Sequence, residues 1–139
     1  MNPESDHYSE LSCYTLSHGD AAFIHQHVVD AYTAQTADET TKAIAMVFAL
    51  IGLFLHVELG FTGKQVQRAH MQLAKRRRTW PRPQLPIDRG AIRVAEVLAA
   101  EPGPARDAKI YAWAAAVWQA YAPCHREIAE IARHELNVR

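Results

Sequence analysis

The longest apolar run, Ala43 to Leu55, sets the strongest limit on what this chain of 139 residues can fold into. A membrane-spanning helix needs about 20 apolar residues, so this run is too short to cross a bilayer. A helix built from it would be apolar on nearly every side, and such a helix belongs in the middle of a bundle. The run therefore predicts a central buried helix and no membrane contact.

Small residues follow one another along this expected helix. Ala45, Ala49, Gly52 and His56 are spaced at i, i+4, i+7 and i+11, which places them on one face. We expect this stripe to let a neighbouring helix approach closely or to leave a cavity beside His56.

Helical spacing also recurs elsewhere in the chain. We expect a first helix from Asp20 to about Gln35, and the central one from about residue 39 to residue 59. Thr62 and Gln65 form a capping-box pattern that starts a third helix, which a run of basic residues at 75–78 would close. A last helix runs from residue 105 to the C-terminus, and Pro123 kinks or restarts it.

The rest of the chain is expected to connect these helices. The prolines of WPRPQLP, residues 80–86, force an extended connection, and residues 87–100 read as either a short strand or a short helix. Residues 1–17 are expected to be extended or poorly ordered. The fold class is therefore all-α, a single domain over 1–139 with four main helices, a long proline-containing connection and a short extra element around 87–100.

Composition narrows the broad class of protein. Apolar residues make up 49% of the chain and charged residues 22%, which is ordinary for a globular protein and excludes disorder. The N-terminus is polar and acidic and does not resemble a secretory signal, so we expect a cytoplasmic protein. Cys13 and Cys124 are far apart and show no zinc or redox spacing, so both are expected to be reduced thiols.

The charges are unevenly distributed although the net charge is zero. Residues 1–60 hold one lysine against eight acidic residues, whereas residues 61–109 hold eleven basic against four acidic ones. Such a split suggests that acidic and basic segments meet within the chain or within a homodimer, or that an anionic partner binds. The neutral total, with only Trp80 near the basic run, argues against a dedicated nucleic-acid binder.

Two histidines and an aspartate stand close together in FIHQHVVDAY, residues 23–32. Each residue of an α-helix turns by about 100°, so His27 and Asp30 lie about 60° apart on one face. His25 and His27 diverge by about 200°, so they do not share one ion. We expect His27 and Asp30 to point inward and His25 to lie closer to the outside.

Three further histidines fall on apolar faces of expected helices. His56 ends the small-residue stripe, His70 interrupts an apolar face, and His125 follows Trp118 by two turns. Inward histidines on separate helices are how a bundle builds a metal or acid–base centre. The metal hypothesis therefore takes His27, His70 and either His56 or His125 as ligands, with Asp30 as a ligand or orienting His27.

Imidazole with one carboxylate suits Zn, Ni or Fe(II), so a divalent transition metal is the expected cofactor if one is bound. Other interpretations of the same residues remain open. A carboxylate–histidine couple of His27 with Asp30 is equally compatible with a structural network that binds no metal. Four aromatic residues either line a ligand pocket or pack in the core: Tyr111, Trp113, Trp118 and Tyr121.

Three stretches of the chain have distinctive sequences. They read YTLSHGDAAFIHQHVVDAYTAQ from residue 14, FALIGLFLHVELGFTGKQVQRAHMQLAKRRRTWPRPQLP from residue 48, and WAAAVWQAYAPCHREI from residue 113. Together they resemble the DUF5946 family, a bacterial domain of unknown function, over residues 14–128. The matched motif positions are His25, His27, Asp30, Tyr32, Gln35, His70, Trp80, Trp113 and Trp118.

The resemblance implies a small, bacterial, cytoplasmic protein and supplies no activity. Some relatives carry cysteines near the N-terminus in a zinc-knuckle-like spacing, but this chain has only Cys13 there, so no such site is carried over. A looser architectural analogy is to DinB-like four-helix bundles, in which histidines from separate helices hold a divalent metal.

The leading functional hypothesis is a helical-bundle protein with a histidine-centred polar pocket, which binds a divalent metal and acts as a metal-dependent enzyme. The alternative is a non-enzymatic binding or interaction protein, dimeric, in which the same histidines are structural. The sequence identifies no small-molecule ligand for either.

Overall fold

The computed structural model describes residues 2–138, and every regular element within them is helical. The α-helices are α1 (Pro3–His18), α2 (His25–Thr36), α3 (Ala43–Val57), α4 (Gly63–Leu73), α5 (Val94–Ala99), α6 (Pro104–Ala120) and α7 (His125–Leu136), and a 3-10 turn spans Ala122–Cys124. The all-α prediction is therefore confirmed.

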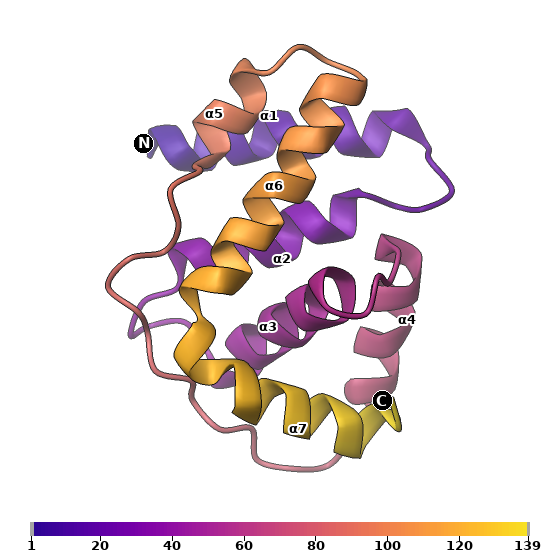
Figure 1. Cartoon of the computed structure of the whole chain (residues 1–139), viewed down its shortest axis with the longest axis vertical. Coiled ribbons are helices and arrows are strands. Elements are labelled where there is room, and N and C mark those ends of the chain that lie inside the picture. Colours follow the sequence, from indigo (N-terminus) through magenta and orange to yellow (C-terminus); the bar gives the residue numbers. More distant parts are fainter. Residues whose placement is uncertain (1, 139) are drawn as a thin grey trace.

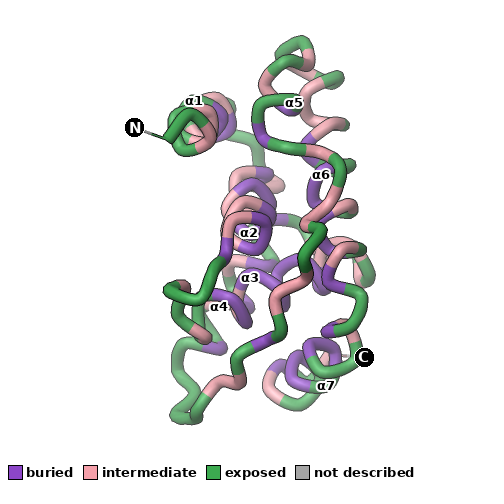
Figure 2. Tube along the Cα trace, turned by 90° about the vertical axis from the view of Figure 1, so that its left-hand side faces the viewer, coloured by how far each residue is buried: buried purple, intermediate pink, exposed green. Residues whose placement is uncertain are grey.

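The apolar helix α3 lies at the centre of the molecule, as its sequence predicts (Figure 1). Helices α2, α4, α6 and α7 all pack against it, and α1 and α5 lie together at the top of Figure 1, where α1 packs on α2 and α5 packs on α6. Figure 2 shows the buried positions concentrated in α2, α3 and the inner faces of α6 and α7. No helix described over residues 2–138 is both long and apolar enough to span a membrane.

The four expected helices correspond to α2, α3, α4 and a final pair, but the boundaries differ. The last helix is not one kinked helix, because the 3-10 turn that contains Pro123 separates α6 from α7. Helix α4 ends at Leu73, so residues 75–78 lie beyond it and are exposed. Residues 94–99 form a helix, which excludes the alternative of a strand there.

The prediction that residues 1–17 are extended or poorly ordered is wrong for residues 3–17, which belong to α1, while residue 1 lies outside the described residues. Asn2 caps this helix by accepting a hydrogen bond from the Glu4 amide at 3.0 Å, and Pro3 occupies its first turn. Only Leu11 and Thr15 of α1 are buried. With so narrow a buried face, the periodic apolar signal that identifies a helix in a sequence is nearly absent.

The first expected helix begins later than Asp20. Phe23 has a φ of 58°, which breaks the helical path, and regular structure starts at His25. The Asp20 carboxylate accepts a hydrogen bond from the amide of Ile24 at 3.2 Å, just before the helix, and α2 itself has no side-chain cap. The capping box predicted for Thr62 and Gln65 is present at the start of α4.

The long proline-containing connection is held against the C-terminal end of α2. Arg89 donates hydrogen bonds to the carbonyl oxygens of Ala34, Gln35 and Ala37, which lack partners within the helix. The buried Gln35 amide in turn donates to the Ile92 carbonyl at 2.7 Å and accepts from Trp113 Nε1 at 3.0 Å. The connection is therefore part of the packed structure.

Among residues 2–138, the acidic segment 1–60 and the basic segment 61–109 form one ion pair, between Glu4 Oε2 and Arg93 Nε at 3.4 Å. Two arginines of the basic run, Arg76 and Arg78, pair instead with Glu135 of α7, at 3.5 and 2.6 Å. All of these arginines are partly exposed, so such pairs stabilise the fold only weakly. The homodimer stays a prediction.

Candidate functional site

Helices α2 and α3 bring His27 and His56 face to face in the interior. The two imidazole rings are stacked with centroids 3.5 Å apart and planes inclined by 19°. His27 is 2% exposed and His56 is half-buried. The predicted inward orientation of His27 and Asp30 is confirmed, while His25 is only half-buried and contacts Thr15 of α1.

Both stacked imidazoles are held in the neutral form. Burial, and to a smaller extent the neighbouring His56, lower the pKa of His27 to about 3. Burial also lowers the pKa of His56, against the opposing effect of its hydrogen bond to the Phe61 carbonyl. Neutral imidazole is the form that binds a metal ion, so neither ring has to lose a proton first.

The two rings differ in how their nitrogen atoms are satisfied. His56 Nδ1 lies 3.1 Å from the Phe61 carbonyl oxygen, which can only accept, so Nδ1 carries the proton and Nε2 keeps its lone pair. His27 Nδ1 is buried and has no hydrogen-bond partner among residues 2–138. A buried polar atom without a partner is costly and points to a binding role.

Tyr111 of α6 lies beside both histidines on the solvent side. Its ring centroid is 5.3 Å from that of His56 and 6.0 Å from that of His27, and the side chain is exposed. Burial raises the pKa of Tyr111, and the carboxylates of Asp20 and Asp107 raise it further. The phenol therefore stays protonated, and two carboxylates lie close enough to Tyr111 to act on it.

A second cluster of polar side chains lies along the same contact between α2 and α3. The Gln26 amide donates to Asp30 Oδ1 at 3.1 Å and approaches His70 Nδ1 of α4 at 3.5 Å. His70 Nε2 lies 2.7 Å from the Phe48 carbonyl oxygen, so it carries the proton and donates it. His70 therefore belongs to a network that links α2, α3 and α4.

Asp30 is the member of this network whose burial costs the most free energy. Its carboxyl is fully buried, and burial raises its pKa well above the usual range, although the Gln26 hydrogen bond acts in the opposite direction. Its Oδ2 atom has no hydrogen-bond partner within residues 2–138. The expected couple of Asp30 with His27 is not formed, because the Asp30 carboxyl turns toward Gln26 and α3.

Gly52 makes this arrangement sterically feasible. A Cβ atom at position 52 would overlap Asp30 Oδ2 and come within 3.2 Å of His70 Nε2. Of the two alternatives expected for the small-residue stripe, the close approach is confirmed, because α2 packs against α3 at Gly52. The place beside His56, where the other alternative put a cavity, holds the stacked ring of His27. Ala45, the first residue of the stripe, is exposed and takes no part.

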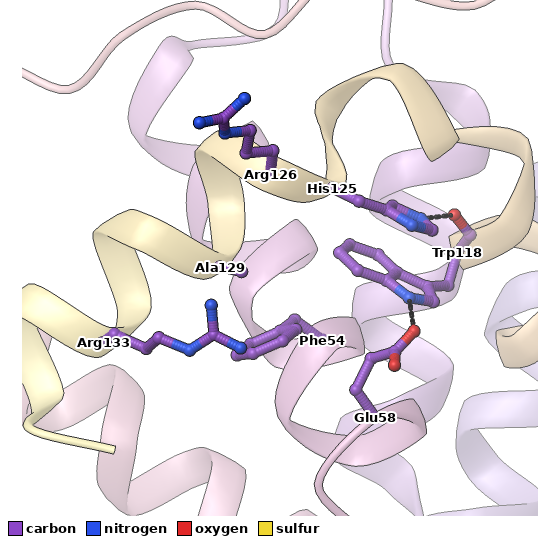
Figure 3. Close-up of a pocket in the computed structure, with 7 residues that line it drawn as sticks. All are labelled: Phe54, Glu58, Trp118, His125, Arg126, Ala129 and Arg133. Carbon is purple, nitrogen blue, oxygen red and sulfur yellow. Dashed lines mark hydrogen bonds between the residues drawn. The ribbon is translucent and has the colours of Figure 1, made fainter. Parts of the chain in front are cut away.

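His125 lies apart from the other histidines. It stacks on Trp118 with ring centroids 3.8 Å apart, and its Nε2 donates to the Trp118 carbonyl at 2.6 Å (Figure 3). The five predicted site residues are thus distributed over three places: His27 with His56, Asp30 with His70, and His125 alone. Within residues 2–138 no three His, Cys, Asp or Glu side chains are grouped to hold one metal ion.

Sequence reasoning missed Gln26 and Tyr111 as members of the site. Gln26 lies next to His27 in the sequence but bridges Asp30 and His70, which requires knowing that α4 packs beside α2. Tyr111 was considered only as a core or pocket aromatic. No local pattern marks it, because its place beside the histidines depends on how α6 crosses α2 and α3.

The fold and the site together define an all-helical protein with a line of histidine and carboxyl groups enclosed between two closely packed helices. The chain belongs to a family of unknown function, DUF5946, whose model matches residues 5–122. Neither a curated protein nor a solved structure shows detectable similarity to the chain. The family match covers every candidate site residue except His125.

Proposed function

We propose that this protein binds a divalent transition metal ion through His27 and His56, and that further positions on the ion are left to water or an external ligand. The observation that carries the proposal is the stacked pair of neutral imidazoles on separate helices, one of which has a buried nitrogen atom without a partner. No reaction is assigned to the ion.

The groups around His27 and His56 favour the binding of a cation. His56 Nδ1–H donates to the Phe61 carbonyl, which is the arrangement that orients a metal-ligating histidine and leaves Nε2 as the ligand atom. The carboxylates that raise the pKa of Tyr111, those of Asp20 and Asp107, add negative charge on the solvent side. The Tyr111 hydroxyl can donate a hydrogen bond to water or an anion held by the ion.

Binding requires a small rearrangement. In stacked rings inclined by only 19° the nitrogen lone pairs lie in two nearly parallel planes, so they do not converge on one point. One ring has to turn for both nitrogen atoms to reach one ion at about 2.0–2.1 Å. His27 is the ring that can turn without losing a hydrogen bond at Nδ1, whereas His56 is held by the Phe61 carbonyl.

The alternative of structural histidines fits the other two positions. His70 and His125 each donate from Nε2 to a backbone carbonyl oxygen, which is the usual state of a buried structural histidine. The metal proposal is therefore restricted to His27 and His56. This restriction removes His70, His125 and Asp30 from the ligands that the sequence alone suggested.

The test is calorimetric titration of tag-free protein with Zn²⁺ and with Ni²⁺, supported by elemental analysis of protein purified without added metal. We expect one ion per chain, and affinity about tenfold weaker or worse in His27→Ala and in His56→Ala. His125→Ala is the matched control because it removes an equally stacked histidine. Absence of binding to the wild-type protein, or an equal loss in the control, would overturn the proposal.

A further inference from the structure

A separate pocket opens at the other side of α3, where its C-terminal end meets α6 and α7 (Figure 3). Its volume is about 260 Å³. It is lined by Phe54, Glu58, Trp118, His125, Arg126, Ala129 and Arg133. Pockets for drug-sized ligands start at about 300 Å³, so this one is suited to a molecule with a single ring.

The apolar wall of the pocket is made of aromatic rings in fixed positions. Phe54 and Trp118 are both buried, and their ring centroids are 6.0 Å apart at an angle of 50°. His125 stacks behind Trp118 and is itself held by its hydrogen bond to the Trp118 carbonyl. A flat ring inserted against this wall makes offset or edge contacts without reordering the side chains.

A cation and an anion face each other across this wall. Figure 3 shows Arg133 reaching over the Phe54 ring toward Trp118, and its guanidinium carbon lies 5.7 Å from the Phe54 ring centroid. Arg133 forms no ion pair with any side chain of residues 2–138. Arg126, two turns earlier on α7, points away from the wall, and among the described residues it pairs only with the exposed Glu130.

Glu58 supplies the opposite charge. Its Oε2 accepts a hydrogen bond from Trp118 Nε1 at 2.8 Å, which fixes the carboxylate at the edge of the indole ring. The second carboxylate oxygen remains available as an acceptor, because Glu58 is exposed and forms no ion pair among the described residues. The pocket thus offers a carboxylate-binding fork, an aromatic wall and a hydrogen-bond acceptor.

From these three features we infer that the pocket binds a small aromatic carboxylate that also carries a hydroxyl or amino group. The ring lies against Phe54 and Trp118, the carboxylate pairs with Arg133, and the hydroxyl or amino group donates to Glu58. A guanidinium binds a carboxylate in a bidentate manner, which gives both direction and strength to that contact.

The test uses the full chain labelled with ¹⁵N, and it follows the indole N–H signal of Trp118 during titration with 4-hydroxybenzoate. The signal is assigned with Trp118→Phe. We expect a saturable shift with 4-hydroxybenzoate, a weaker one with benzoate, and none with phenol or with inorganic phosphate. Phenol lacks the carboxylate, and phosphate lacks the ring.

Two variants separate the contacts. Arg133→Gln should weaken 4-hydroxybenzoate binding by about tenfold, the size expected for one charge-assisted contact. Glu58→Gln should reduce the preference for 4-hydroxybenzoate over benzoate. Arg68→Gln is the control, because Arg68 is exposed on α4 outside the pocket.

The inference is overturned if 4-hydroxybenzoate causes no shift at millimolar concentration. It is overturned equally if phosphate binds as well as 4-hydroxybenzoate, which would indicate a simple anion site, or if Arg68→Gln weakens binding as much as Arg133→Gln. None of these outcomes depends on a metal at His27 and His56, so this test and that of the proposed function fail independently.

Discussion

Two histidine stacks in this protein look alike but differ in what holds them. His27 lies on His56 with ring centroids 3.5 Å apart, and His125 lies on Trp118 at 3.8 Å. His125 Nε2 donates a hydrogen bond to the Trp118 carbonyl, and Trp118 Nε1 donates one to Glu58. Each ring of that stack is therefore held by a hydrogen bond of its own. In the other stack, His27 Nδ1 is buried without one.

The difference lies in what each stack contributes. The His125–Trp118 stack is a satisfied structural unit that forms the wall of a pocket. The His27–His56 stack belongs to a contact between α2 and α3 that also encloses the unpartnered Asp30 Oδ2, so this contact holds two buried polar atoms at a cost. An energetic cost retained in a packed interior indicates a function more clearly than stacking geometry does.

The largest effect is expected from closing the space that the α2–α3 contact needs. In Gly52→Ala the new methyl group overlaps Asp30 Oδ2, so we expect a loss of about 3 kcal/mol in the free energy of unfolding. Urea denaturation measures it. Adding Asp30→Ala to this variant should recover part of the loss, because the overlapping carboxyl is gone; a single variant as stable as wild type would contradict the close approach.

The second largest effect is expected from acid, which should weaken the α2–α3 contact through His27. The pKa of His27 is about 3 in the folded protein and 6.5 when unfolded, so the unfolded chain binds the extra proton between these values. Stability is then complete above about pH 6.5 and falls with pH by about 1.4 kcal/mol per unit from His27 alone. Denaturant unfolding from pH 7 to pH 5 should show a shallower slope for His27→Gln than for wild type.

Asp30 should act in the opposite direction. Its folded pKa lies well above 3.8, so the folded protein holds a proton that the unfolded chain has released, and this contribution to stability is lost as pH rises. Asp30→Asn imitates the protonated carboxyl and removes that loss. We expect the variant to be as stable as wild type or more stable at pH 7, and its stability to depend more steeply on pH between 4 and 6.5. Destabilisation that grows with rising pH would mean that the carboxylate is charged and paired.

The smallest effect is expected at the His125–Trp118 stack, whose ring N–H groups both have hydrogen-bond acceptors. Glu58→Ala removes the acceptor for Trp118 Nε1, and because Glu58 is exposed, water can partly replace it. A cost of about 1 kcal/mol is expected in thermal or urea unfolding. Glu58→Gln keeps an acceptor oxygen and should cost less than half as much. Equal losses in both variants would show that the charge matters more than the hydrogen bond.

Several features of the fold could be predicted from the sequence because they depend on local spacing. The apolar run predicted the central helix α3, and helical periodicity placed His27 and Asp30 inward with His25 further out. Helix α1 was missed because it buries only Leu11 and Thr15, so it leaves little periodic signal. The division between α6 and α7 stayed open because a proline can either kink or end a helix.

The candidate site could be predicted only in part. The sequence identified four inward histidines, but helical spacing cannot tell which ones meet, since that depends on how each helix is rotated and where it crosses its neighbours. The pairing of His27 with His56 rather than with His70 is a property of the α2–α3 crossing. The turn of the Asp30 carboxyl toward Gln26 has the same origin.

The sequence by itself determined an all-helical chain, a central apolar helix with a stripe of small residues, and the inward face of α2. Only the tertiary structure decided that the histidines divide into a stacked pair, a hydrogen-bonded network and the wall of a pocket. The physical reason is that helix formation and amphipathicity follow from residues within one or two turns of each other. Contacts between side chains on different helices follow from the packing of whole helix surfaces, which no single stretch of the chain encodes.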